Sequence, residues 1–331
     1  MTPRKLAFGW RIHFIVRRAK KLSKKAQYEP KKFDLQYRND FLIRKIKTLL
    51  KLFRVKLVVK GYENLGSGPA LLVANHQDNV DSVLLLYALK KQTEDREEVN
   101  KIATFLAKHT LLYDRHSRHI LTSIDTFFLN RNDPKASLET YQNFGKFVKA
   151  NKTFGIIFAE GTRNQVGDVG PFKPGAFKVA KKELLPIIPV TINNSVQGYN
   201  LNRKTWLEVE IIFHKKIPAL SLTTQTTIAI AERVHQIVKS RFKPPQLPFI
   251  ASPAEAGDIE TSKAAIKWHK QEAKREHRAV KKAQKERRQE QRLLEAQHRD
   301  DQKYEKYQAK LKHKHTQTDS EGETQNTDET N

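Results

Sequence analysis

Cysteine is absent from this 331-residue sequence, and its absence excludes disulfide bonds, thiolate zinc sites and a cysteine nucleophile. No uninterrupted apolar run approaches the roughly 20 residues that a membrane-spanning helix needs. The glycine patterns of dinucleotide-binding and phosphate-binding loops are also missing, so we expect no nucleotide cofactor. The histidines at 109, 116 and 119 lack a set of acidic partners, so we interpret them as solvated side chains and expect no metal site.

Acidic residues are scarce toward the two ends of the chain. Residues 1–60 contain 19 Lys+Arg and 3 Asp+Glu, and residues 263–315 contain 18 and 8. The middle, residues 61–262, is nearly balanced with 25 and 20, and only the last 16 residues are acidic. The balanced part is long enough to bury a hydrophobic core. The basic ends favour a polyanionic partner, either an anionic membrane or a nucleic acid.

Two helical patterns near the start combine apolar and basic residues. Residues 6–25 begin with aromatic and aliphatic side chains and continue with Arg and Lys, and residues 35–54 carry an apolar stripe flanked by basic residues. Such helices are typical of interfacial membrane anchors, although a helix packed on the domain with a solvated basic face has the same pattern. For residues 6–25 we favour the membrane. Nucleic acid is the weaker alternative, because no known binding module accompanies the charge. We expect no signal peptide, because no small-residue cleavage site is evident.

Short β-rich runs alternate with helical patterns through the middle of the chain. This alternation predicts an α/β fold, in which a mixed sheet is flanked by helices. We expect strands at 55–60, 71–74, 126–129, 153–158, 187–192 and 209–213. We expect helices at 82–91, 101–111, 136–150, 173–184 and 225–241.

Composition divides the chain into five segments. Residues 1–54 form the basic amphipathic pair, and residues 55–245 the α/β domain. Prolines then end the domain, and residues 246–261 are interpreted as a linker. Residues 262–315 have neither Gly nor Pro and predict a charged helical tail, more a solvated helix than a coiled coil. Residues 316–331 are acidic and predicted to be disordered.

The run Asn75-His76-Gln77-Asp78-Asn79-Val80-Asp81 lies between two apolar stretches, which predicts a strand, a turn and a helix start. A histidine beside a carboxylate is the minimal unit for taking a proton from a hydroxyl group. On one helix, five residues would set His76 and Asp81 about 140° apart, so they can meet only if His76 lies in the turn. The alternative is that neither residue is catalytic: His76 would be an ordinary loop histidine, and Asp81 an aspartate near a helix N-terminus. We expect Asn75 to cap the turn and Asp78 to point outward.

Three further blocks follow in order. They are Phe127-Phe128-Leu129-Asn130-Arg131, Phe158-Ala159-Glu160-Gly161-Thr162-Arg163-Asn164 and Ile187-Ile188-Pro189-Val190-Thr191-Ile192. With the His76 run, they resemble in sequence, order and spacing the four motifs of the glycerolipid acyltransferases, especially the 1-acylglycerol-3-phosphate acyltransferases. The resemblance covers roughly residues 35–245.

The resemblance implies a glycerolipid-acyltransferase-like fold and a set of roles. His76 would be the general base, and Asp81 would be the carboxylate that orients it. The reaction would transfer an acyl chain directly from a thioester to the 2-hydroxyl of lysophosphatidic acid. Matched positions imply that Arg131, Glu160, Gly161, Thr162, Arg163 and Lys108 bind the phosphate and glycerol of the acceptor. Arginine suits phosphate because its fork can bind two oxygens. Gly161 and its neighbours are also candidates for oxyanion donors.

The remaining matched residues and the donor are less defined. Pro189 and Val190 would shape the floor of an acyl tunnel, or form an ordinary core strand. The donor would be acyl-coenzyme A or acyl-acyl-carrier protein, with no cofactor. The implied location is the cytoplasmic face of the cell membrane, as a peripheral protein. The alternatives are acylation of another lysophospholipid or glycerol 3-phosphate, and a non-catalytic protein that binds anionic lipid or nucleic acid.

Overall fold

The computed structural model describes residues 3–95, 97–164 and 167–247, together with residues 267, 270–274, 277–289 and 291. The chain divides into two compact units, Met1–Ser262 and Lys263–Asn331. In the second unit the described residues are helical. The rest of the predicted linker, tail and acidic end lies outside the described residues, so the expected segment boundaries stay predictions.

The first unit is built on a seven-stranded sheet with the order β1-β7-β6-β2-β5-β3-β4. All neighbouring strands are parallel except β6 and β7, which are antiparallel. The strands are β1 Val55–Lys60, β2 Ala70–Ala74, β3 Ala103–Lys108, β4 Phe127–Leu129, β5 Phe154–Phe158, β6 Ile187–Asn193 and β7 Leu207–Phe213. The predicted α/β fold with a mixed sheet and flanking helices is therefore confirmed.

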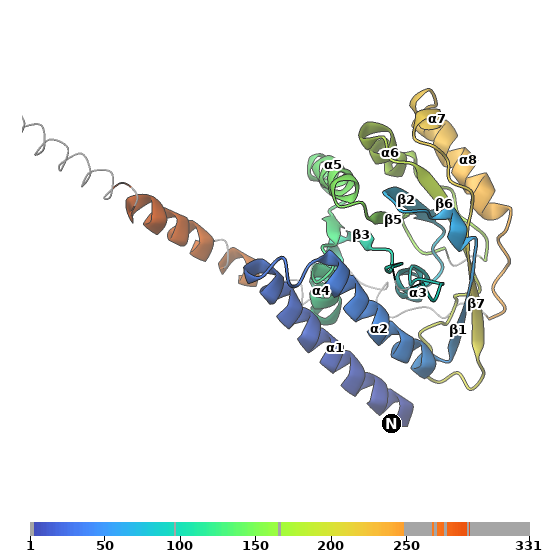
Figure 1. Ribbon diagram of the computed structural model, residues 1–331, viewed down its shortest axis with the longest axis horizontal. Coiled ribbons are helices and arrows are strands. Elements are labelled where there is room, and N and C mark those ends of the chain that lie inside the picture. Colours follow the sequence, from blue (N-terminus) through green and yellow to red (C-terminus); the bar gives the residue numbers. More distant parts are fainter. Residues whose placement is uncertain are drawn as a thin grey trace, which may run out of the picture. The chain divides into compact units, whose positions relative to one another are not determined.

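Helices cover both faces of this sheet, with α2, α3 and α4 on one face and α5, α6 and α8 on the other (Figure 1). The helices of the first unit are α1 Pro3–Tyr28, α2 Leu35–Phe53, α3 Val80–Ala88, α4 Arg115–Thr122, α5 Pro134–Ala150, α6 Lys178–Glu183, α7 Leu220–Thr223 and α8 Thr227–Lys239. Within the part of the chain that the structure describes, short 3₁₀ turns lie at Tyr62–Asn64, His109–Leu112 and Pro174–Phe177.

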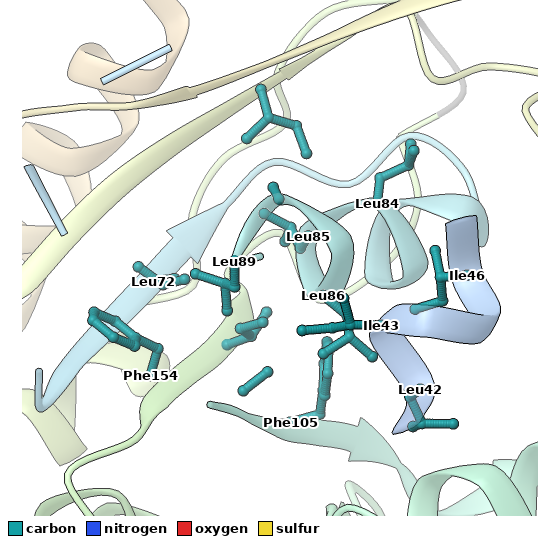
Figure 2. Close-up of a cluster of buried hydrophobic side chains, with 14 of the residues drawn as sticks. Leu42, Ile43, Ile46, Leu72, Leu84, Leu85, Leu86, Leu89, Phe105 and Phe154 are labelled. Atoms are coloured by element: carbon teal, nitrogen blue, oxygen red, sulfur yellow. The ribbon is translucent and has the colours of Figure 1, made fainter. Parts of the chain in front are cut away.

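The alternation of side chains along β2 divides the core into two layers. Ala70, Leu72 and Ala74 pack with α2 and α3, whereas Leu71 and Val73 pack with α5, α6 and α8. The first layer is shown in Figure 2, where leucines and isoleucines of α2 and α3 meet side chains of β2, β3 and β5. Because β2 is buried on both faces, its sequence reads as a continuous apolar run, as expected for a central parallel strand.

Helix α1 lies along α2 and α4 and presents two different faces (Figure 1). Ile15, Val16, Ala19 and Leu22 are buried against the domain. The opposite face is exposed, with Leu6, Trp10 and Phe14 in its first half. Exposed basic residues follow in the second half: Arg17, Arg18, Lys20, Lys21 and Lys24. The helix is therefore packed on the domain, and its outer face changes from apolar to basic along its length.

One predicted helix is wrong. Residues 101–111 were expected to be helical, but residues 103–108 form β3, which pairs with β5 on one side and β4 on the other. Ala103 and Phe105 enter the core on one face, and Thr104 bonds to Thr153 on the other. Burial between two strands therefore overrides the helical pattern, as tertiary context often does.

Candidate active site

The strands β2, β5, β3 and β4 run parallel, so their carboxyl ends lie at one edge of the sheet. His76 follows β2, and the segment from Glu160 to Arg163 follows β5. Lys108 ends β3, and Arg131 lies two residues beyond β4. Ligands of open α/β sheets bind at this edge, outside the carboxyl ends of the strands. The fold thus brings residues from three of the four sequence blocks to one edge.

His76 lies in the turn after β2, and Asp81 lies in the first turn of α3. The imidazole Nδ1 of His76 is 2.8 Å from Oδ2 of Asp81. The same oxygen accepts the N–H groups of Gln77 at 2.7 Å and Asp78 at 2.9 Å. Because a carboxylate only accepts, Nδ1 is the donor in this contact, and in the neutral imidazole Nε2 then keeps its lone pair. The position of His76 in the turn therefore allows its contact with Asp81, which a continuous helix would prevent.

The environment of this pair is unequal. The Asp81 side chain is fully buried, whereas that of His76 is 17% exposed. The Phe158 ring stacks on the imidazole with centroids 4.1 Å apart and planes 22° apart. The buried carboxylate therefore fixes one edge of the imidazole while the ring stays accessible. Phe158 lies in a matched block, but nothing in the local sequence indicates its contact with His76.

Glu160 is 5% exposed and binds two backbone amides. Its Oε1 accepts the N–H of His76 at 2.7 Å, and its Oε2 accepts the N–H of Gly170 at 2.9 Å. Burial raises the pKa of Glu160 to about 7, although both hydrogen bonds oppose the shift. The Glu160 carboxyl therefore titrates near neutral pH while it contacts the backbone N–H of His76.

The two arginines differ in their surroundings. Arg131 is exposed and donates a hydrogen bond to the carbonyl oxygen of Gly161. Arg163 is half-buried. Burial raises the pKa of the Asp78 carboxyl, Asp81 adds to this shift, and the positive charge of Arg163 opposes it. Arg163 therefore lies near the His76 turn, and Arg131 contacts the segment that follows β5.

The other matched positions have plainer settings. Thr162 and Lys108 are exposed at the carboxyl edge. Gly161 has a φ of +76°, which suits glycine, and its own N–H donates to the Phe158 carbonyl. The Gly161 amide is therefore engaged within the turn, and an oxyanion role for Gly161 and its neighbours stays a prediction. Val190 pairs with Ala74, two residues before His76, and Pro189 pairs with Val73. Both are buried in the interior strand β6, so the acyl tunnel stays a prediction.

Two expectations about the turn itself are wrong. Asn75 does not cap the turn; its amide donates to the Ile192 carbonyl at 2.9 Å and accepts the Ile192 N–H at 2.8 Å, which ties the turn to β6. Asp78 does not point into solvent, because it is half-buried and accepts the N–H groups of Val80 and Gln197. The signal for these contacts was absent from the local sequence, since Ile192 and Gln197 lie more than 100 residues away.

Among the described residues, no group of three or more His, Asp or Glu side chains is arranged to hold a metal ion. An imidazole oriented by a buried carboxylate is the arrangement found in enzymes that take a proton from a hydroxyl group. At the carboxyl edge of an α/β sheet, with arginines nearby, it defines an enzyme class: α/β transferases and hydrolases that act on a hydroxyl or ester.

Comparisons with known proteins narrow this class. The family described as "Acyltransferase" matches residues 56–193. A probable 1-acyl-sn-glycerol-3-phosphate acyltransferase of Mycoplasma genitalium is 25% identical over 229 residues, covering 66% of this chain and 83% of its own length. The Saccharomyces cerevisiae 1-acyl-sn-glycerol-3-phosphate acyltransferase is 31% identical over 182 residues, covering 53% of this chain and 56% of its own.

A solved structure agrees in fold. The 1-acyl-sn-glycerophosphate (LPA) acyltransferase PlsC from Thermotoga maritima superposes with a TM-score of 0.51 at 22% identity, covering 72% of this chain and 95% of that one. Residues 56–193 are therefore similar to the acyltransferase family, in agreement with the named relatives. The resemblance of the four sequence motifs to this family is thereby confirmed.

Proposed function

We propose that this protein transfers an acyl chain from an acyl thioester to the 2-hydroxyl of 1-acylglycerol 3-phosphate, making phosphatidic acid for phospholipid biosynthesis. The observation that carries the proposal is the 2.8 Å contact between His76 and the buried Asp81 at the carboxyl edge. The names of the related acyltransferases from Mycoplasma and yeast support the choice of acceptor.

In the proposed reaction, Nε2 of His76 takes the proton of the acceptor hydroxyl as its oxygen attacks the thioester carbonyl. Asp81 keeps Nδ1 protonated and stabilises the imidazolium that forms. When the tetrahedral intermediate collapses, the carbon–sulfur bond breaks and the imidazolium returns the proton to the leaving thiolate. The chain has no cysteine, which fits direct transfer without an acyl-cysteine intermediate.

The acceptor phosphate is assigned to the arginines near the turn. Arg131 follows β4 and Arg163 follows β5, so both reach the edge where His76 lies. A guanidinium can donate two parallel hydrogen bonds to phosphate oxygens. Lys108 and Thr162, exposed at the same edge, would contribute charge and a hydroxyl donor.

The proposed location is the cytoplasmic face of the cell membrane, as a peripheral protein. In the described part of the chain, no helix combines the length and apolarity needed to span a bilayer. The exposed face of α1 supports a surface location, because it offers Leu6, Trp10 and Phe14 next to a run of basic residues. A non-catalytic lipid- or nucleic-acid-binding protein would need the charge but not the oriented His76–Asp81 pair.

An assay on purified protein tests the function. A panel of lysophosphatidic acid, other lysophospholipids and glycerol 3-phosphate would be offered with acyl-coenzyme A and with acyl-acyl-carrier protein. We expect the highest kcat/KM with lysophosphatidic acid and the product phosphatidic acid, identified by mass spectrometry. The donor comparison decides between the two carriers. Preference for another acceptor by tenfold or more would contradict the proposed substrate.

A further inference from the structure

Glu160 has both carboxylate oxygens engaged by the protein's own backbone. Oε1 accepts the N–H of His76 at 2.7 Å, and Oε2 accepts the N–H of Gly170 at 2.9 Å. A Cβ added to Gly170 would lie 2.6 Å from Oε2, so glycine is needed for this close approach. A side chain that is 5% exposed and holds two amides is poorly placed to hold a substrate as well.

The segment that carries Glu160 holds His76 from other directions too. Asn164 donates its N–H to the carbonyl oxygen of His76 at 2.8 Å. Phe158 covers one face of the imidazole, with ring centroids 4.1 Å apart. The backbone N–H, the backbone carbonyl and one ring face of His76 therefore all contact residues 158–164. The Nδ1 atom of His76 is bound separately, by Asp81 on α3.

We propose that Glu160 is a positioning residue for the base: it fixes the main chain of His76 against Gly170 and does not bind the acceptor. The proposal rests on the proposed function only in naming His76 as the base. It replaces the role implied by the family resemblance, in which Glu160 aligns an arginine or a glycerol hydroxyl.

The physical reason is that proton transfer requires Nε2 to lie within hydrogen-bond reach of the hydroxyl. A displacement of about 1 Å in a reacting group can cost about 10²-fold in rate. The ring of His76 is oriented by Asp81 through Nδ1, but the position of its Cα depends on the main chain. Glu160 and Asn164 determine that position through the two backbone groups of His76.

The first test is Glu160→Gln, which keeps the shape of the side chain. A Gln oxygen can accept one of the two N–H groups, but its NH₂ group would face the other donor. We expect kcat to fall by about 10- to 100-fold. We expect KM for the acceptor to change by less than about twofold, because only the position of the base is lost. Acceptor binding would be measured separately by titrating the variant with lysophosphatidic acid in the absence of donor.

Two further variants serve as comparisons. Glu210→Gln makes the same chemical change at a mostly buried glutamate on β7. Glu210 accepts a hydrogen bond from Asn193 and pairs with Lys60. We expect kcat and KM of this variant to change by no more than about twofold, because substitutions away from such features usually have small effects. Phe158→Leu keeps an apolar side chain but removes the ring stacked on His76. We expect a smaller loss of kcat in the same direction, with KM preserved.

A separation of kcat from KM decides the outcome. If Glu160→Gln weakens acceptor binding tenfold or more while kcat is kept, Glu160 is a substrate ligand and the proposal is overturned. If Glu160→Gln does not fold, Gly170→Ala takes its place, because its Cβ displaces Oε2; a normal kcat in that variant also overturns the proposal. If wild type prefers another lysolipid, the proposed substrate fails, and the same separation is measured with that lysolipid.

Discussion

Oδ2 of the fully buried Asp81 accepts three hydrogen bonds, and the one from His76 Nδ1 is the only one that comes from a side chain. The other two come from the backbone of the turn itself. Asp81 therefore orients both the imidazole and the loop that carries it. Substitutions at the two positions should fail for different reasons, and this difference can be measured.

His76→Ala should lower kcat by about 10²- to 10⁴-fold, because general-base catalysis contributes about that much. The fold should remain, since the His76 side chain is partly exposed and Oδ2 of Asp81 keeps its two backbone N–H donors. Turnover of lysophosphatidic acid is the measurement, with circular dichroism as the control for folding. Activity equal to wild type would show that another group takes the proton. Asp81→Asn should be impaired too, because a neutral amide cannot stabilise the imidazolium that forms. It should also lose stability, since a neutral amide oxygen accepts the N–H groups of Gln77 and Asp78 less strongly than a carboxylate does.

Substituting Arg131 or Arg163 with Ala should cost a charge-assisted hydrogen bond of about 1.5–3 kcal/mol. The loss should raise the apparent KM for lysophosphatidic acid and leave that for the donor nearly unchanged. Lysine should rescue only in part, because it keeps the charge but not the planar fork. The control acceptor is a monoacylglycerol, which lacks the phosphate. Equal losses on both acceptors would mean that the arginines support the fold or the donor site.

Much of the fold was predictable because burial leaves a clear pattern. The runs that became β2 and β6 are buried on both faces and read as continuous apolar segments bounded by turns. Parallel strands then place the residues after β2, β4 and β5 at one edge, so the meeting of His76, Arg131 and Glu160 near that edge follows from the topology. The exception was β3, where an apolar run could be fitted by either period.

The contacts that hold the site were not predictable from local sequence. The bonds from Asn75 to Ile192 and from Asp78 to Gln197 join residues more than 100 positions apart. The stacking of Phe158 on His76 depends on the register of β5 beside β2, in which Phe158 pairs with Ala74. The register of a strand is determined by the packing of the complete core. The site residues could therefore be predicted from the sequence, but the contacts between them could not.

The raised pKa of Glu160 predicts a specific dependence of stability on pH. Its folded pKa of about 7 lies above the ordinary value of 4.5, so the folded state binds more protons between these values. Stability from this group is therefore present below pH 4.5 and is lost as pH rises through 7. The free energy of unfolding of wild type, minus that of Glu160→Gln, should fall by up to about 3 kcal/mol between pH 5 and 8. Urea unfolding at several pH values measures it, and a difference independent of pH would contradict the shift.

Arg38 connects α2 to the turn before β4 and is a test of stability away from the site. It donates two hydrogen bonds to Asp125, at 3.0 and 2.7 Å, and a third to the Ser123 carbonyl at 3.1 Å. Arg38→Ala should cost about 2 kcal/mol, less than for a fully buried pair because Asp125 is partly exposed. Lys56→Ala, which removes an exposed ion pair with Glu208, should cost under about 1 kcal/mol. Similar unfolding free energies for both variants would contradict the ranking.

The exposed face of α1 should carry membrane binding. Trp10 is 71% exposed, and Leu6 and Phe14 lie on the same face, one helical turn to either side. Deleting α1 would be a poor test, because Ile15, Val16, Ala19 and Leu22 are buried and their loss would expose the core. Replacing Leu6, Trp10 and Phe14 together with Gln leaves that buried face intact. Since burying each large apolar side chain contributes about 1.5–3 kcal/mol, partitioning to anionic vesicles should fall by tenfold or more.

The matched control changes two other large apolar residues that are also well exposed. Leu220 on α7 and Ile228 on α8 are 79% and 69% exposed, and replacing both with Gln should leave vesicle binding unchanged. High salt should release wild type only in part, because screening weakens the basic residues of α1 but not apolar burial. Cosedimentation with vesicles containing an anionic phospholipid measures both effects. Complete release by modest salt would instead indicate purely electrostatic docking, and an equal loss in the control variant would show that α1 has no special role.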